Sequence, residues 1–367
     1  KDEIAIIERL GRENLEAIEA TIKKYNIDCG FELTGEISVA NEEWQLNDLI
    51  EIAELRNSYG DSVQILSKEE MQARVNSPIS VGGLWDPDGT ALIDPARLVW
   101  GLEQACIKSG VVIYENTSAL WLERTSNGII VHTPYGEVHA KKVALATNIY
   151  RSLLRRAKKY VVPVYDFQLV TEPLTPEQMD SIGWKNREGL SEAGNQFHYY
   201  RLTKDNEILW GGYDAIYNFR GKVRHEYETS AETYAHLAQA FLETFPQLKE
   251  IKFTHGWGGA IDTCSRFTQF WGKAYRGKVA YVMGYTGLGV GSSRFGAQVM
   301  LDLLDGEDNE RTRLSMVRKK PIPFPPEPFK FIFIRLTQWS LNKSDQNQGK
   351  RNLWLKFLDF FGLGFDS

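Results

Sequence analysis

The feature that most constrains this chain is a short apolar stretch that runs into a glycine-rich loop and then a helical pattern, all near its C-terminal end. The stretch KVAYVMG (278–284) predicts a buried strand of the kind found in parallel sheets. Gly284 is the first of four glycines within eight residues (284–291), and apolar residues of helical period continue to Leu304. Such loops bring backbone N–H groups at a helix N-terminus close to an anionic ligand. Two interpretations stay open: a ligand-binding loop, or a turn that needs glycine only for packing.

A second unit with clear boundaries lies earlier in the chain. Asp94 is a predicted helix cap, Pro95 takes the first helical position, and the helical pattern stops at Gly110. Residues 111–124 then predict a strand, followed by a small meander and a short strand over 142–148 that ends in Ala-Thr-Asn. This order of elements resembles that of flavoproteins.

The remaining residues predict a β-rich body. Four aromatic stretches between residues 159 and 264 alternate in polarity, which favours an antiparallel sheet, and a helical pattern over about 230–244 crosses them. Toward the N-terminus we expect a helix over 4–25, a strand over 31–40, helices over 43–60 and 68–74, and a hairpin over 81–94.

Composition excludes several functions. The 367 residues carry a formal charge of −5 with both signs interspersed, so we expect no nucleic-acid partner. Six histidines and three cysteines occur without CxxC or HExxH spacing, so we expect no metal site. No apolar run reaches the length that crosses a membrane. An odd, sparse cysteine count fits a reducing compartment, and we expect a cytoplasmic protein.

Five stretches, in the same order along most of the chain, resemble a known family. They are LTGEISVA, DPARLVWGLEQACIKSGVVIYENTSALWLE, KVALATN, HGWGGAIDTCSRF and VAYVMGYTGLGVGSSRFGAQVMLDLL. The sequence resembles the FAD-dependent oxidoreductases of the D-amino-acid oxidase fold, a group that includes glycine oxidase, sarcosine oxidase and γ-glutamylputrescine oxidoreductase. The tail from FPPEP to GLGFDS resembles a bacterial subgroup close to the last type.

The resemblance implies an α/β protein in which an incomplete Rossmann-like FAD-binding domain is joined to a substrate domain built on an antiparallel sheet. The FAD-binding domain would cover residues 94–155 and 265–310. The substrate domain would cover 1–93 and 156–264, with a helical tail over 311–367.

One difference from the family leaves alternative functions open. The family's first strand and its GxGxxG loop, which bind the FAD pyrophosphate, do not occur here, so the sequence resembles the C-terminal three-quarters of such an enzyme. As an enzyme it would oxidise an amine or amino acid by hydride transfer from the substrate carbon to flavin N5, and the imine would then hydrolyse. The alternatives are a non-catalytic remnant, a binding or scaffold module, or the C-terminal part of a split enzyme. The sequence does not identify the electron acceptor.

By resemblance, the late glycine loop lies beside the flavin ring, near its N1–C2=O edge. A helix N-terminus there would stabilise negative charge on the ring. Asn148 stands where the family usually has glycine, and asparagine tolerates a left-handed backbone well. The expected cofactor-binding residues are Ala119, Ala146, Thr147, Asn148, Gly284, Tyr285, Gly287, Leu288, Gly289 and Val290.

Substrate contacts are expected from the aromatic sheet and from one arginine. Strand alternation sends His198 and Tyr200 to one face and Tyr199 and Arg201 to the other; one face would pack on a core and one would cover the flavin. A core of satisfied aromatic residues is an equal alternative. Arg266 would clamp a substrate carboxylate, or form a structural ion pair. The candidate catalytic residues are His198, Tyr200, Tyr213, Trp257 and Arg266.

One cysteine bears on whether the flavin is bound covalently. Cys264 lies in the region where sarcosine oxidases bind flavin covalently, but its spacing to the glycine loop differs, so we expect non-covalent FAD and a buried thiol.

The tail helices WSLNKSDQ and NLWLKFLDFF are amphipathic. They suit peripheral contact with a membrane surface, although packing against the FAD-binding domain is favoured because their polar face is mixed in charge.

Overall fold

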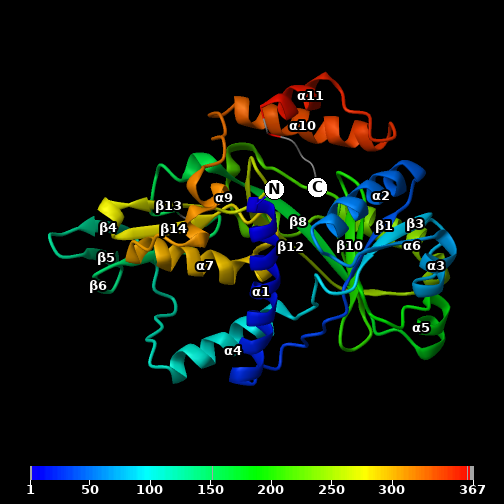
Figure 1. Cartoon of the computed structure of the whole chain (residues 1–367), viewed down its shortest axis with the longest axis horizontal. Helices are drawn as coiled ribbons and strands as arrows, with labels where there is room; N and C mark the ends of the chain where they lie inside the picture. Colours follow the sequence, from blue (N-terminus) through cyan, green and yellow to red (C-terminus); the bar gives the residue numbers. More distant parts are fainter. Residues whose placement is uncertain (1, 151, 362, 364–367) are drawn as a thin grey trace.

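The computed structural model describes residues 2–150, 152–361 and 363, which form two sheet-containing bodies and a helical tail (Figure 1). The larger body contains a mixed eight-stranded sheet of order β12-β8-β11-β10-β9-β1-β3-β2. Its strands are β1 (Glu36–Ala40), β2 (Gln64–Leu66), β3 (Gly82–Asp86), β8 (Val161–Thr171), β9 (Gly189–Glu192), β10 (His198–Leu202), β11 (Ile208–Gly212) and β12 (Phe253–Cys264). Neighbouring strands are antiparallel except β1 and β9, which are parallel.

One face of this sheet packs into an aromatic core against α6 (Ala231–Thr244). Phe167 and Leu169 of β8 and Trp210 of β11 meet Phe241 of α6 on this side, and Phe245 follows directly after the helix. Because side chains alternate along a strand, the intervening residues of β8 must point to the opposite face. The core therefore decides which residues remain for a ligand.

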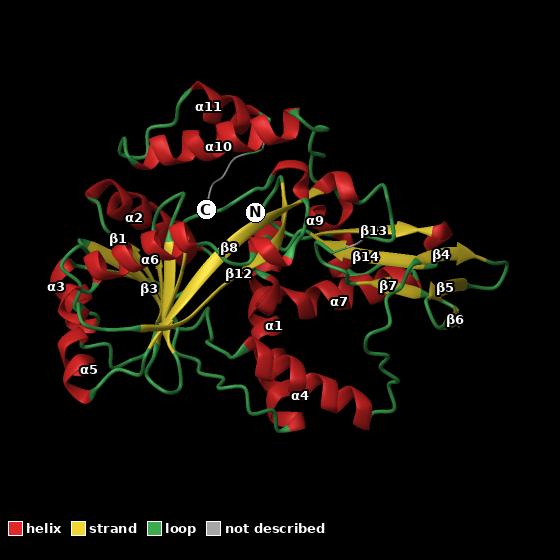
Figure 2. Cartoon of the chain, turned by 180° about the vertical axis from the view of Figure 1, so that it is seen from behind, coloured by secondary structure: helices red, strands yellow, loops and turns green. Residues whose placement is uncertain are grey.

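The smaller body is organised around β14 (Val279–Met283), whose five residues are all buried. It pairs antiparallel with β13 (Phe270–Ala274) and parallel with β7 (Val143–Leu145). A separate meander consists of β4 (Trp121–Arg124), β5 (Ile129–Thr133) and β6 (Gly136–Ala140). The long strands β8 and β12 run from the large sheet toward β13 and β14, joining the two bodies (Figure 2).

Helices cover both bodies. The chain begins with α1 (Asp2–Tyr25), which lies between the bodies with α4 (Pro95–Lys108) near its foot (Figure 1). Asn14 of α1 donates a hydrogen bond to the Gly291 carbonyl of α7 (Gly289–Asp305). The other helices are α2 (Glu43–Ser58), α3 (Lys68–Arg74), α5 (Pro176–Ile182), α8 (Glu310–Arg313), α9 (Ser315–Arg318), α10 (Phe329–Asp345) and α11 (Leu353–Phe360).

Several predicted elements agree with the structure. Asp94 caps α4 as expected, because its side chain accepts a hydrogen bond from the backbone N–H of Arg97 at 3.1 Å. The strand predicted over 111–124 is correct only for 121–124. Val111 to Tyr114 form no strand and are exposed, because no strand among the described residues pairs with them. The hairpin over 81–94 is also wrong. Instead β3 pairs with β1 and β2, while Leu92 bridges to Glu32.

The first tail helix, α10, does not pack where the sequence suggested. Ile334 of α10 packs against Val162 of β8 and Tyr217, and Asp345 accepts from the backbone N–H groups of Asn195 and Gln196. The helix therefore lies over the body with the large sheet rather than over the smaller body around β14. The hydrogen bonds between Asp345 and the loop at residues 195–196 help to hold α10 in this position. The periodicity of the sequence does not predict such long-range bonds. No helix in the described part of the chain combines the length and apolar character needed to span a bilayer.

Candidate functional site

The glycine loop links the end of β14 to the start of α7. Three of its residues have left-handed backbones, with φ of 81° at Gly284, 52° at Thr286 and 90° at Gly287. A side chain at Gly284 has little room, since a Cβ there would lie 3.0 Å from the Cβ of Cys264. Gly287 and Leu288 are exposed, so the turn presents backbone to its surroundings. The glycines thus serve both conformation and access.

Asp262 holds this loop from β12. Its carboxylate accepts from the N–H of Gly284 at 2.5 Å and from the N–H of Tyr285 at 3.2 Å, and its side chain is 2% exposed. Burial raises the pKa of Asp262 to about 6, although these N–H groups favour the ionised form. The residue therefore fixes the loop at a cost in desolvation.

The first turn of α7 leaves backbone donors available. Leu288 is its N-cap and provides no side-chain hydrogen bond. The N–H groups that open a helix have no partner within it, and here Gly289 and Val290 are the first to be in that position. These donors and the positive end of the helix dipole make the loop suitable for negative charge on a planar ring.

A second backbone segment leaves the same edge of the small sheet. Because β7 and β14 are parallel, with Leu145 opposite Tyr281, their C-terminal ends lie side by side. Ala146, Thr147 and Asn148 follow β7, and Asn148 adopts the expected left-handed conformation with φ of 50°. Ala119 is partly buried just before β4. Ligands of open α/β sheets bind at such carboxyl ends.

The large sheet turns a polar face away from its core. Its register aligns Trp257 of β12 with Gln168 of β8, Gln168 with Gly211 of β11, and Gly211 with Tyr199 of β10. Paired residues point to the same side, so these four positions form one row across the sheet. Trp257 is 42% exposed, which leaves this end of the row open.

A hydrogen-bonded group occupies the middle of this face. The Tyr199 hydroxyl donates to Asp166 Oδ2 at 2.5 Å and accepts from Gln168 Nε2 at 2.8 Å. Burial raises the pKa of Asp166, and burial together with the Asp166 charge raises the pKa of Tyr199 strongly. Sequence analysis missed Asp166 and Gln168. The available signal was their spacing, since both are polar, two residues apart, in an otherwise apolar strand.

The glycine loop and this polar face lie close together. Asp166 pairs with Gly259, and Val164 pairs with Ile261 two residues further along β12. Ile261 Cδ1 is 3.8 Å from the position that a Cβ on Gly287 would take. Within the described residues, the loop therefore adjoins the sheet face that carries Asp166, Gln168 and Tyr199.

His198 and Tyr200 lie on the opposite, core-facing side. Tyr200 is 3% exposed and packs between Trp184 and Trp210. His198 Nδ1 lies 2.7 Å from Glu192 Oε2, and the imidazole stacks on both Trp210 and Tyr213. This placement favours the alternative of an aromatic core for Tyr200. The structure brings His198 and Tyr213 together but separates them from the face that carries Tyr199.

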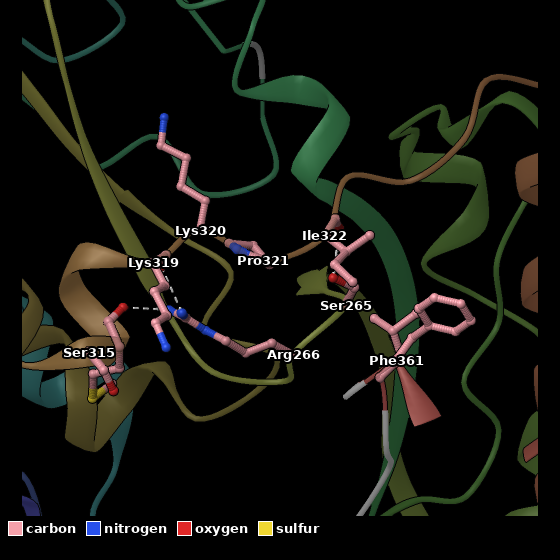
Figure 3. A pocket seen from close by; sticks show the side chains of 10 residues that line it. Ser265, Arg266, Ser315, Lys319, Lys320, Pro321, Ile322 and Phe361 are labelled. Carbon is pink, nitrogen blue, oxygen red and sulfur yellow. Dashed lines mark hydrogen bonds between the residues drawn. The ribbon is translucent and has the colours of Figure 1, made fainter. Parts of the chain in front are cut away.

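Arg266 is committed to backbone carbonyls (Figure 3). Its guanidinium donates to the carbonyls of Gln269 at 2.5 Å, Met316 at 2.8 Å, Lys319 at 2.9 Å and Thr268 at 3.4 Å. It lines a cavity of about 340 Å³ together with residues of the segment 315–322. These bonds differ from the predicted carboxylate clamp and from the structural ion pair. They tie the start of the tail to the turn between β12 and β13.

Cys264 is fully buried at the end of β12. Its thiol donates to the Thr268 carbonyl at 3.2 Å, and burial raises its pKa. A thiol in this state is a poor nucleophile. The geometry agrees with the expected buried, structural role.

Comparison with known proteins identifies relatives along most of the chain. A family described as FAD dependent oxidoreductase (DAO) matches residues 2–303. The chain is 28% identical over 320 residues to the probable oxidoreductase OrdL of Haemophilus influenzae, covering 85% of this chain and 69% of that protein. It is 30% identical over 315 residues to γ-glutamylputrescine oxidoreductase of Escherichia coli, covering 85% of this chain and 70% of that protein.

Solved structures show the same fold. Glycine oxidase from Geobacillus kaustophilus superimposes with a TM-score of 0.71 at 19% identity, covering 84% of this chain and 82% of that one. L-proline dehydrogenase from P. horikoshii gives a TM-score of 0.71 at 17% identity, with the same coverage.

Proposed function

Because this chain belongs to the DAO family of FAD-dependent oxidoreductases, we propose that it oxidises a small amine or amino acid at the face where the glycine loop meets the large sheet. The observation that carries the proposal is this juxtaposition of exposed loop backbone, through Gly287 and Ile261, with the Tyr199–Asp166–Gln168 group. The relative from E. coli, named for γ-glutamylputrescine, supports an amine as substrate.

The residues present fit the ring end of FAD. Gly287, Leu288 and Val290 are exposed where α7 begins, and a Cβ on Gly291 would meet nothing within 4 Å. FAD would supply a two-electron acceptor there, taking a hydride from the substrate carbon at flavin N5. The open N–H groups at the start of α7 would hold the cofactor and stabilise the negative charge that it carries when reduced. Non-covalent binding is proposed because the Cys264 thiol is buried.

We assign the amine to Asp166. A partly buried carboxylate attracts an ammonium group, and its raised pKa makes it a better proton acceptor than an exposed aspartate. The substrate nitrogen must lose its proton before hydride can leave the neighbouring carbon. Tyr199 and Gln168 would orient the carboxylate, and Trp257 would form an apolar wall. His198, Tyr200 and Tyr213 would support the sheet from behind, and Arg266 would act through the tail.

The Asp166→Asn variant tests this assignment. With an amine that the enzyme oxidises, we expect kcat/KM to fall about 100-fold and the acidic limb of its pH profile to disappear. Asp205→Asn, on an exposed turn, is the matched control and should leave both unchanged. An unaltered kcat/KM in Asp166→Asn would remove this residue from the site.

The alternative of a non-catalytic or split protein has one observation in its favour. Val111 to Tyr114 are exposed and belong to no strand, and no strand among the described residues pairs with the free edge of β7. The visible absorbance of the purified chain, before and after acid precipitation, separates the proposals. A flavin spectrum released by acid supports the non-covalent enzyme. Colour that stays with the pellet implicates Cys264. A colourless chain that takes up no added FAD supports the alternative.

A further inference from the structure

The helix α10 has two apolar faces. Ile334 and Leu341 are buried toward the rest of the molecule. On the other side, Phe329, Ile332, Leu336 and Trp339 recur at helical spacing, and each is 36% to 66% exposed. A helix that only covered its own domain would be polar on this outer side. The outer stripe therefore needs a separate explanation.

The following helix repeats the pattern. Leu355 and Leu358 of α11 are buried against α10, and the Trp354 indole N–H donates to Thr337 Oγ1 at 3.0 Å, which fixes the hairpin of the two helices. Leu353, Phe357 and Phe360 face outward and are 51% to 86% exposed. Both helices form an outer layer of the molecule (Figures 1 and 2).

The charge of this segment is opposite to that of the rest of the chain. Residues 318–361 contain nine Lys and Arg and three Asp and Glu, a net charge of +6. The whole chain carries −5, so the remaining residues carry −11. Arg335, Lys343 and Lys356 are exposed beside the two apolar stripes. Long basic side chains in this position reach a headgroup while their stems lie along apolar surface.

We propose that the outer face of α10 and α11 binds an anionic lipid surface. Aromatic and aliphatic side chains on one side of a helix, with cations at its margins, suit the boundary between headgroups and acyl chains. A second copy of this face is disfavoured as the occupant, because α10 and α11 (residues 329–360) contain six Lys and Arg and two Asp, and two such hairpins of net charge +4 repel each other. An acidic membrane offers both the apolar interior and the opposite charge. This inference is independent of the substrate and of FAD.

Co-sedimentation with vesicles tests the proposal. We expect the full chain to bind vesicles of phosphatidylcholine and phosphatidylglycerol at 7:3, to bind phosphatidylcholine alone far more weakly, and to lose affinity in high salt. The double variant Trp339→Ser, Phe360→Ser should bind about 100-fold more weakly, at about tenfold for each side chain. Trp100→Ser on α4 removes an equally exposed tryptophan elsewhere and should leave binding unchanged.

A charge variant keeps the test valid if the apolar variant unfolds. Arg335→Glu with Lys343→Glu changes exposed side chains and should abolish the preference for anionic vesicles, while circular dichroism stays unchanged. Equal binding by this variant and the parent chain would overturn the proposal. So would a dimer in sedimentation velocity without vesicles that Trp339→Ser dissociates, since a second copy would then occupy the face.

Discussion

Single residues at the loop carry much of the predicted chemistry. Gly284 and Asn148 end neighbouring parallel strands, and both have left-handed backbones. Sequence analysis placed both beside the cofactor, and the conformational part of that argument is confirmed for Asn148. Gly284 is further restricted by its neighbours, because a Cβ there would lie 3.0 Å from Cys264 and Phe270. Two predictions belong to this scale.

Gly284→Ala should destabilise the chain. A Cβ at this position meets Cys264 and Phe270 at 3.0 Å, and alanine disfavours a φ of 81°. We expect the free energy of unfolding in urea to fall by about 2 kcal/mol. Gly291→Ala, in the first turn of α7 with open space around it, should be neutral or slightly stabilising. Equal effects of the two substitutions would show that glycine is not needed at Gly284.

Asp262 should make stability depend on pH. Its folded pKa, about 6, lies above the unfolded value of about 3.9. Such a group contributes most stability below about pH 4, where it is protonated in both states, and its contribution is lost as the pH rises to about 6. The change is about 3 kcal/mol. Denaturation between pH 4 and 7 should show this decline in the parent chain and not in Asp262→Asn. Parallel pH profiles would contradict it.

Stretches with similar strand-like sequences differ in whether a neighbouring strand pairs with them. Residues 111–114 have a strand-like sequence but remain exposed, whereas the equally apolar start of β8 is buried between β12 and the tail. A strand is defined by hydrogen bonds to a neighbour, so sequence pattern alone cannot distinguish these two stretches.

The same substitution should therefore have a very different cost at two valines. Val112 is 71% exposed, and Val112→Ala should change the free energy of unfolding by less than about 0.5 kcal/mol. Val162 is 2% exposed against Tyr217 and Ile334, and Val162→Ala should cost about 2 kcal/mol. Chemical denaturation of both variants measures the difference. A large cost at Val112 would indicate that 111–114 has a structural neighbour in this chain.

At the scale of the whole molecule, a few contacts connect the two bodies and the tail. The strands β8 and β12 join the bodies, Asp262 of β12 fixes the glycine loop, and Arg266 anchors the segment that leads to α10. The position of α10 and α11 therefore depends in part on Arg266, which the sequence analysis predicted to be a substrate ligand.

Arg266→Ala should loosen the tail. Removing the guanidinium leaves the carbonyls of Gln269, Met316 and Lys319 without this donor, and we expect a loss of about 2 to 4 kcal/mol. Trypsin should cut after Arg318 and Lys319 faster than in the parent chain. Arg155→Ala, at an exposed site, serves as the control. Unchanged cleavage with a lower kcat/KM for amino acids would restore the role of Arg266 as a carboxylate clamp.

The sequence by itself determined the family and most of the local elements, because these depend on spacing and on conformational preference within short stretches. The strand, glycine loop and helix from 278 to 304, the cap at Asp94 and the left-handed Asn148 follow from local rules. The tertiary structure alone decided which face of the large sheet packs on α6, and so turned Tyr200 inward and Tyr199 outward. It also brought Asp166 near Gly287 and surrounded Arg266 with carbonyls. These relations join residues far apart in the chain, and the free energy of packing, rather than any local pattern, selects them.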